Sequence, residues 1–365
     1  MFVGVGVLKR QGQRSRPGRD GTFTLRSEIL VRMPPSAVSS TYRSAPLLLN
    51  LERDPTSGLW ALASTWCNLG LWPAGSGSAG DGGSFQHACE ALALRVGEAA
   101  RLQPGDTVLD VGVGYADQTA LWATRFRAAR VVAVEPSRPH VAEAREAQAA
   151  GRLAGGSVVE LHVGSADELP ACCSAPVPIF DACICLDCAY HFRSRGRFLQ
   201  KMGTLLRPGG RFAAADLIVA EREEEEDQEE AGQTLLRGNG GILGMLRSWL
   251  GSQWRVVARR LVATLCDIPA VNLHGAVEYK QSLHAAGLVS VEIEPISERV
   301  LLPFAAHAHR QRAALRGQLR YGESAFLWII ALLFGYVARH RLFDVVLVRA
   351  CKPTTRELHA KQQYR

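Results

Sequence analysis

The chain has few lysines, few aromatic side chains and no long uninterrupted apolar run. Only 5 of its 42 basic residues are lysines, and aromatic residues make up 7% of the 365 residues. The net charge of +7 on its own would suggest a nucleic-acid-binding protein. However, no stripe of interleaved basic and aromatic residues marks a groove binder. We therefore attribute the arginine-rich composition to sequence bias and expect no nucleic-acid partner.

The longest apolar stretch, 325–334, is shorter than the roughly 20 residues that a membrane-spanning helix needs. Residues 335–337 extend it only slightly before Arg339. The default interpretation is a buried helix. The alternative is a helix lying on a membrane surface, flanked by Arg320, Arg339 and Arg341, so peripheral membrane contact through 325–337 stays open.

The nine cysteines are an odd number, and no secretory signal peptide is evident. We therefore expect reduced thiols and an intracellular location. The spacing of Cys183, Cys185 and Cys188 resembles half of a metal motif, but no second Cys/His pair lies at a zinc-like distance. Small apolar residues on one face of a buried strand are the favoured interpretation, and we predict no metal site.

Residues 1–45 contain seven arginines and one lysine against two acids. Such a segment is typical of an organelle transit peptide or of a disordered extension, and both readings stay open. The protein is accordingly expected in the cytoplasm or in an organelle. Residues 46–350 are expected to form the main domain, with 351–365 as a tail.

Strands and helices alternate along the main domain. Strands are predicted at 107–112, 130–135, 157–163, 179–186, 211–218, 289–296 and 343–350, and helices at 85–101, 117–127, 138–150, 193–206 and 276–286. This order predicts an α/β fold, a Rossmann-like seven-stranded and mostly parallel sheet covered on both faces.

Two insertions interrupt this pattern, at about 221–272 and 298–341. The first opens with eight acids within 221–230, a self-repelling run that is most simply a solvated loop. Apolar residues at helical spacing follow it and suit a helical cap.

The most informative segment is 107–118, where an apolar strand containing Asp110 is followed by Gly112 and Gly114. Glycines at these positions let a ligand approach the backbone closely. A dinucleotide site would need a third glycine at the position of Asp117, and an acid opposite a pyrophosphate is unfavourable. A carboxylate at Asp110 instead suits a cationic ligand.

This Asp-x-Gly-x-Gly pattern resembles the cofactor loop of class I S-adenosylmethionine (SAM) methyltransferases, whose ligand carries an amine and a sulfonium. Ala116 stands where that family often has a further glycine, which is tolerable if its φ is negative. The acid Glu135 ends the next strand and is expected to accept the ribose hydroxyls. Asp167 is expected to accept the adenine amine, with a capping role as the alternative. Asp187, after strand 179–186, faces the same crevice.

The resemblance covers about 85–220, and Pro208-Gly209-Gly210 before a strand is also typical of the family. Residues 66–72 look like the lid of its small-molecule branch, which includes tocopherol, sterol and natural-product methyltransferases. Cys67 replaces the lid tyrosine of that branch. The Asn-Pro-Pro-Tyr motif of amino-group methylation is absent, since 187–190 reads Asp-Cys-Ala-Tyr.

Methyl transfer to a hydroxyl needs a base in addition to alignment of the reactants. His191, just beyond the fourth strand, is our candidate, because a histidine titrates near pH 6.5. Asp216 is predicted to orient or charge-pair with it, as comparable residues do in the resembling sugar methyltransferases. The alternative is a histidine that simply packs against Tyr190 and Phe192.

The two insertions and the segment 60–72 are rich in Trp, Leu, Ile and Phe and should form an apolar acceptor pocket. Asp267 and Asn272 are either polar groups of this pocket or turn residues. We therefore predict SAM-dependent methylation, at oxygen or carbon, of a hydrophobic small molecule. A non-catalytic SAM-binding scaffold is the alternative, which Ala116 and Cys67 favour.

Overall fold

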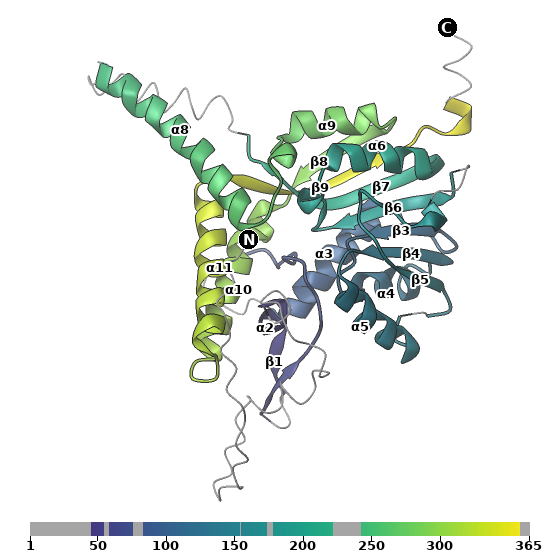
Figure 1. The fold of residues 1–365 in the computed structure, drawn as a ribbon, viewed down its shortest axis with the longest axis horizontal. Helices are drawn as coiled ribbons and strands as arrows, with labels where there is room; N and C mark the ends of the chain where they lie inside the picture. Colours follow the sequence, from purple (N-terminus) through teal and green to yellow (C-terminus); the bar gives the residue numbers. More distant parts are fainter. Residues whose placement is uncertain are drawn as a thin grey trace, which may run out of the picture.

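The computed structural model describes residues 45–54, 58–75, 83–153, 155–173, 178–221 and 242–357. Its centre is a seven-stranded sheet with the order β5-β4-β3-β6-β7-β9-β8 (Figure 1). The strands are β3 Thr107–Val111, β4 Arg130–Glu135, β5 Val158–Val163, β6 Phe180–Leu186, β7 Leu206–Val219, β8 Val289–Pro295 and β9 Phe343–Cys351. Only β9 runs antiparallel to its neighbours in this sheet. The predicted mostly parallel, Rossmann-like sheet is confirmed.

Helices cover both faces of the sheet, as its apolar strands require. The helices α3 Phe85–Ala99, α4 Asp117–Thr124 and α5 Arg138–Ala149 pack on one face. The helices α6 Arg195–Leu205 and α9 Ala276–Ala285 pack on the other. Successive strand residues alternate between the two layers: Ile184 joins the α3 side, while Cys183 and Cys185 join the α6 side and are fully buried. These two cysteines are core residues, as favoured above.

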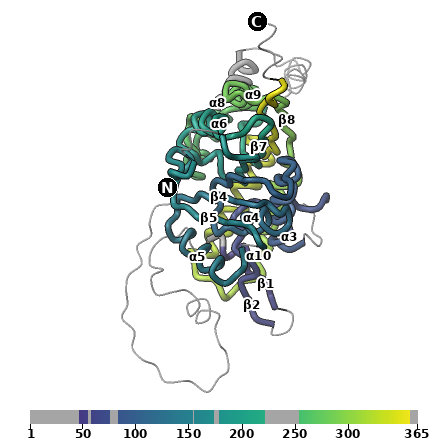
Figure 2. Tube along the Cα trace, turned by 90° about the vertical axis from the view of Figure 1, so that its right-hand side faces the viewer, coloured from purple at the N-terminus to yellow at the C-terminus, as the bar shows by residue number. Residues whose placement is uncertain are grey.

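Several elements outside the sheet were not predicted from the sequence. These are the short helix α2 Ala45–Leu49, the hairpin of β1 Leu51–Arg53 and β2 Trp60–Leu62, and the helix α10 Leu301–Ala314. Strands of three residues are too short to show a hydrophobic period. The hairpin projects from the lower edge of the molecule (Figures 1 and 2).

Both insertions contain helices, and these lie together at one end of the sheet (Figure 1). The first contributes α8 Ile242–Leu265, and the second contributes α10 and α11 Tyr321–Arg339 between β8 and β9. The rings of Phe304 and Phe334 lie 4.9 Å apart and join α10 to α11. The acidic run within 222–230 and the leader 1–44 lie outside the described residues.

The default expectation of a buried helix at 325–334 is wrong. Leu327 and Val337 are the two buried residues of α11. Trp328 is 48% and Leu332 53% exposed. Within the described residues, α11 is the one helix whose length and apolar character would suffice to cross a membrane. Hydrophobicity in the sequence could not reveal which side of this helix meets the protein core.

Candidate active site

The loop between β3 and α4 needs its first glycine for two reasons. Gly112 has a φ of +76°, a left-handed conformation that strains other residues. A Cβ at this position would also lie 2.7 Å from the side chain of Cys188, which follows β6. Gly114 shares the positive φ, at +57°. The two glycines therefore let the loop turn tightly against the end of β6.

Ala116 does not meet the condition set for it above, because its φ is +71°. It is the N-cap of α4, and its side chain makes no capping hydrogen bond. An L-residue in the left-handed region costs roughly 1–2 kcal/mol. Ala116 therefore has a left-handed, glycine-like backbone conformation although it has a Cβ.

The cofactor loop, the lid and the end of β6 enclose a cavity of about 60 Å³. It is lined by Thr65, Trp66, Cys67, Asn68, Gly112, Val113, Gly114, Tyr115, Asp117, Gln118, Leu186 and Asp187. Three of the predicted site residues, Gly112, Gly114 and Asp187, are thus brought together. Small-molecule sites usually have about 300–1,000 Å³, so this cavity is smaller than a typical one.

Asp110 lies beneath the cofactor loop rather than in this cavity. Its carboxylate accepts hydrogen bonds from Gln118 Nε2 at 2.7 Å, Thr119 Oγ1 at 2.7 Å and Trp122 Nε1 at 2.9 Å. Burial raises its pKa to about 6, against the opposing effect of these three donors. Asp110 therefore fastens α4 to β3, and its predicted contact with the cofactor stays a prediction.

Glu135 and Asp167, the predicted ribose and adenine ligands, also lie outside the cavity lining. Glu135 Oε2 accepts the Gly114 N–H at 3.0 Å, and Oε1 accepts the Ser137 N–H at 3.1 Å. Glu135 thus supports the cofactor loop from below. Asp167 is half-buried after β5, and no described residue forms a hydrogen bond with its carboxylate. Both assignments stay predictions.

Asp187 connects the cavity to the lid. It has a φ of +55°, and its carboxylate accepts the Leu69 N–H at 2.8 Å and the Tyr190 hydroxyl at 2.9 Å. Burial raises its pKa to about 6. Asp117, which also lines the cavity, accepts a hydrogen bond from the hydroxyl of Thr65. Asp187 thus fastens the lid at Leu69, and Asp117 fastens the residue just before the lid.

Asp117 also lines the cavity. It was not predicted as a site residue, because its position in the sequence only argued against a dinucleotide. Burial raises its pKa, as it does for Asp187. No lysine, arginine or histidine is among the residues that line the cavity. Arg152, outside the lining, lowers the pKa of Asp117 only in part. Two acids in a cavity lined by no basic side chain fit a cationic ligand, so the chemistry of these side chains agrees with an amine- and sulfonium-bearing cofactor.

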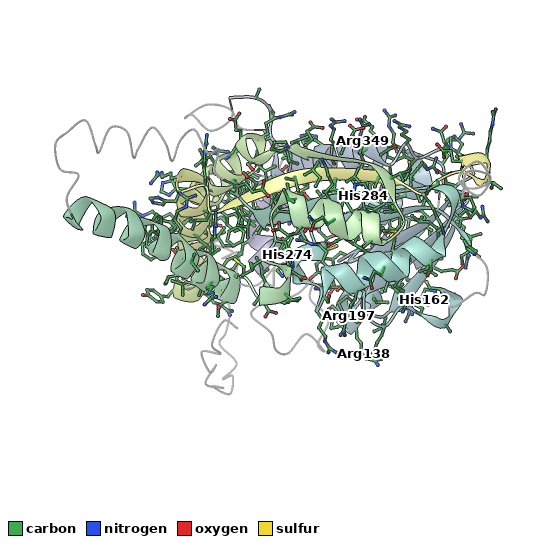
Figure 3. The ribbon with its side chains drawn as sticks, turned by 90° about the horizontal axis from the view of Figure 1, so that it is seen from above. Arg138, His162, Arg197, His274, His284 and Arg349 are labelled. Carbon is green, nitrogen blue, oxygen red and sulfur yellow. The ribbon has the colours of Figure 1, made fainter. Side chains whose placement is uncertain are left out.

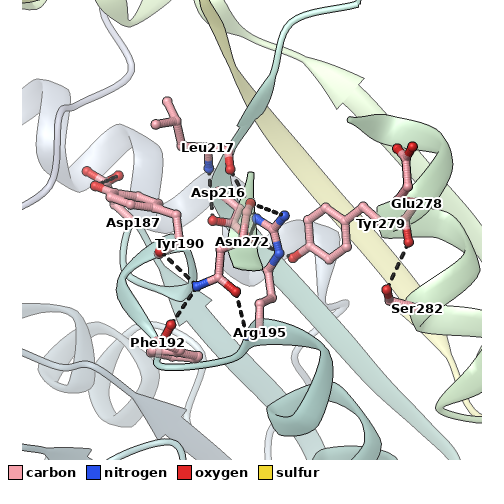
Figure 4. A network of polar contacts seen from close by, with 10 residues as sticks. All are labelled: Asp187, Tyr190, Phe192, Arg195, Asp216, Leu217, Asn272, Glu278, Tyr279 and Ser282. Carbon is pink, nitrogen blue, oxygen red and sulfur yellow. Dashed lines mark hydrogen bonds and ion pairs between the residues drawn. The ribbon is translucent and has the colours of Figure 1, made fainter. Parts of the chain in front are cut away.

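Asp216 was predicted to orient or charge-pair with His191, and this stays a prediction, because the hydrogen bonds of Asp216 go to other residues. Its carboxylate is fully buried and accepts hydrogen bonds from Arg195 Nη1 at 3.0 Å and the Tyr279 hydroxyl at 2.8 Å (Figure 4). The Leu217 N–H occupies the other carboxylate oxygen at 2.8 Å. A fully paired internal ion pair of this kind has a structural role.

Asn272 links this ion pair to the turn that carries His191. Its amide nitrogen donates to the carbonyls of Tyr190 and Phe192, at 3.0 and 2.5 Å. Its amide oxygen accepts the Arg195 N–H at 2.8 Å (Figure 4). Asn272 is therefore neither a pocket residue nor a simple turn residue, because it holds η2 Ala189–His191 in place.

His191 is exposed at the end of η2. Its Nδ1 lies 3.2 Å from the carbonyl oxygen of Asp267, and its ring centroid lies 4.2 Å from that of Tyr190, with the two rings tilted by 47°. Partial removal from water lowers the pKa of the imidazole, against the opposing effect of the Asp267 carbonyl. Through Tyr190 and Asp187, the ring is connected to the cavity wall.

A different cluster contains residue types that bind metals. Glu160, His162 and Cys172 place one potential ligand atom each within 4.8 Å of one another. This cluster is remote from the insertions, because His162 lies at the opposite end of the molecule from α8 (Figure 3). Glu160 already pairs with Arg130 at 2.7 Å, and its second oxygen lies 3.5 Å from His162 Nε2. These contacts account for the cluster, and the prediction of no metal stays a prediction.

Comparisons with known proteins agree with this geometry. Residues 109–214 match the model of a methyltransferase domain family. The chain is 28% identical over 239 residues to an erythromycin 3''-O-methyltransferase of Saccharopolyspora erythraea, covering 66% of this chain and 67% of the relative. It is 25% identical over 164 residues to the O-methyltransferase resE of Aspergillus sclerotiorum, covering 45% of this chain and 58% of the relative.

Among solved structures, the chain resembles the cyclopropane synthase MmaA2 from Mycobacterium tuberculosis. The TM-score is 0.56 at 14% identity, covering 87% of this chain and all of the other. At that identity the likeness concerns the fold alone.

Proposed function

We propose that this chain, which is a class I SAM-dependent methyltransferase, methylates a hydroxyl oxygen of an apolar small molecule and uses His191 as the general base. SAM is its methyl donor, as the methyltransferase domain at 109–214 and the relatives of natural-product type indicate. Both relatives described above are named for transfer to oxygen, which supports a hydroxyl acceptor. The apolar acceptor is inferred from the Trp, Leu, Ile and Phe content of the two insertions and of the segment 60–72.

Three parts of this chain would hold SAM. The backbone at Gly112 and Gly114 allows close approach, and the carboxylates of Asp117 and Asp187 suit its cationic groups. Bound SAM supplies an already activated methyl group on sulfur, so the protein mainly contributes alignment and removal of the acceptor proton.

The hydrogen bond of His191 is the observation that carries the proposed base. The carbonyl of Asp267 is only an acceptor, so Nδ1 must carry the hydrogen in this contact. Nε2 then keeps its lone pair and can accept a proton from a hydroxyl. The lowered pKa keeps the ring neutral near pH 7, which is the form that a general base requires.

The test measures transfer of a labelled methyl group from SAM to a panel of apolar alcohols, phenols and their methyl ethers. We expect His191→Gln to reduce kcat by about 10²–10⁴-fold, with the calorimetric affinity for S-adenosylhomocysteine unchanged. His309→Gln, an exposed histidine on α10, serves as the matched control and should change neither quantity.

The pH dependence gives a second readout. Because protonated His191 cannot accept a proton, kcat of the wild type should fall as the pH drops below its lowered pKa, and His191→Gln should lose this dependence. Equal kcat in both proteins would exclude His191 as the base. Label recovered on carbon would overturn oxygen transfer, and cofactor binding without turnover on any acceptor would favour a scaffold.

A further inference from the structure

Two helices of the insertions expose apolar stripes. On α11, Trp328, Leu332 and Tyr336 follow one another at intervals of four residues and are 48%, 53% and 40% exposed. On α8, Trp254 and Leu261 are 38% and 58% exposed and lie on one helical face. Stripes of large apolar side chains facing water usually mark an interaction site.

The two stripes meet and form one surface. The ring of Trp254 on α8 lies 6.4 Å from Tyr336 and 5.2 Å from His340, edge-on to both. Beside this contact, a hollow of about 500 Å³ is lined by Ile329, Ala331, Leu332, Leu333, Gly335, Tyr336, Arg339 and His340. We call Trp254, Leu261, Trp328, Leu332 and Tyr336 together the α8–α11 surface. It lies at the end of the molecule formed by the insertions (Figures 1 and 3).

The charged residues in the helices around this surface are almost all basic. Residues 301–341 contain six arginines and no lysine, against the single acid Glu323, and 242–265 contain four arginines and no acid. Glu323 is already used, since it accepts the Arg320 N–H at 2.7 Å. Arg339 continues the α11 stripe, one turn beyond Tyr336, and is exposed together with Arg260 of α8. The surroundings are therefore complementary to an anionic partner.

The opposite side of α11 is held against the rest of the protein. Leu327 and Val337 are buried, Phe334 packs against Phe304 of α10, and Arg312 Nε donates to Ser324 Oγ at 3.0 Å. Crossing a bilayer would break these contacts. A helix that keeps one side in the protein and presents apolar residues flanked by arginines suits a position in the plane of a membrane interface.

We propose that the α8–α11 surface docks this protein on an anionic lipid bilayer, with the apolar side chains at the headgroup boundary and the arginines on the lipid charges. Apolar burial and attraction to acidic lipids then act together. This proposal does not depend on the acceptor or on the role of His191.

The test is co-sedimentation of the full chain with vesicles of phosphatidylcholine alone and of phosphatidylcholine mixed with phosphatidylserine. We expect binding to the mixed vesicles that weakens as salt rises. Trp328→Ser combined with Leu332→Ser should reduce the bound fraction several-fold on both vesicles. Arg260→Gln combined with Arg339→Gln should remove mainly the gain from phosphatidylserine.

Val158→Ser combined with Val277→Ser is the matched control, because these apolar residues are 59% and 56% exposed on β5 and α9. It should bind like the wild type. Thermal unfolding of every variant checks that the substituted protein still folds. Wild-type protein that stays in solution with both vesicles would overturn the proposal. A dimer that forms without lipid and is dissociated by the serine pair would assign the surface to a second copy and overturn it as well.

Discussion

The region beneath the cofactor loop and the region beneath η2 each contain a fully buried aspartate, and the two carboxylates are stabilised differently. Asp110 accepts three hydrogen bonds from neutral side chains of α4. Asp216 is paired with the guanidinium of Arg195, which also stacks 4.2 Å from the ring of Tyr279. One region thus contains an uncompensated negative charge, and the other contains a closed ion pair.

This difference separates a site that can respond to a ligand from one that cannot. Burial raises the pKa values of Asp110 and Asp187 to about 6. A cationic ligand in the cavity would favour their charged forms. Asp216 already has its cation in Arg195, and its predicted role beside His191 stays a prediction. Its network fixes the position of the η2 turn.

The largest effect is expected from removing the cation that neutralises Asp216. Arg195→Met should lower the free energy of unfolding by about 3–5 kcal/mol, because it leaves Asp216 buried without a counter-charge. Tyr279→Phe, which removes one neutral donor from the same carboxylate, should cost about 1–2 kcal/mol. Denaturant unfolding measures both values.

The double variant Arg195→Met with Asp216→Leu is the control. Replacing a whole buried pair by apolar side chains is often nearly neutral, so it should recover much of the loss. A loss of less than 1 kcal/mol in Arg195→Met alone would show that solvent reaches Asp216 and that the pair is not closed.

The buried Asp110 beneath the cofactor loop should make the free energy of unfolding depend on pH. The pKa of Asp110 is about 6 in the folded protein and near 3.9 in an unfolded chain, so the folded state binds more protons between these values. The free energy of unfolding should therefore fall as the pH rises from about 4 to about 6. Asp110→Asn should lose this part of the slope, while the part due to Asp187 remains.

Thr119→Val sharpens the same measurement. It removes one hydrogen bond that lowers the pKa of Asp110, so the decline in stability should extend to higher pH than in the wild type. Chemical unfolding at a series of pH values gives both slopes. An Asp110→Asn slope identical to that of the wild type would mean that Asp110 does not titrate in this range.

The fold was readable from the sequence wherever one element contained its own signal. The run Val131–Val134 is apolar at every position because β4 is buried on both faces, and the structure places this strand at the predicted residues 130–135. The glycines at 112 and 114 were likewise informative, since few other residues adopt their backbone conformation.

Sequence reasoning failed where the deciding partner is distant along the chain. The contacts of Asp216 come from Arg195, 21 residues before it, and from Tyr279, 63 residues after it. No local pattern favours these partners over His191. The apolar run in α11 similarly predicts a helix but not its orientation, which depends on the packing of α10 against one of its sides.

The smallest effect concerns Ala116, at the junction of the cofactor loop and α4. Its φ of +71° should cost about 1–2 kcal/mol, which glycine avoids, whereas glycine loses about 0.4–1 kcal/mol more entropy on folding. Ala116→Gly should therefore raise the free energy of unfolding by up to about 1.6 kcal/mol. Ala120→Gly, inside α4, should instead lower it by about 1 kcal/mol, since that backbone is helical. If both changes destabilise the protein equally, Ala116 is not strained, and the departure from the family's glycine has no energetic consequence for this loop.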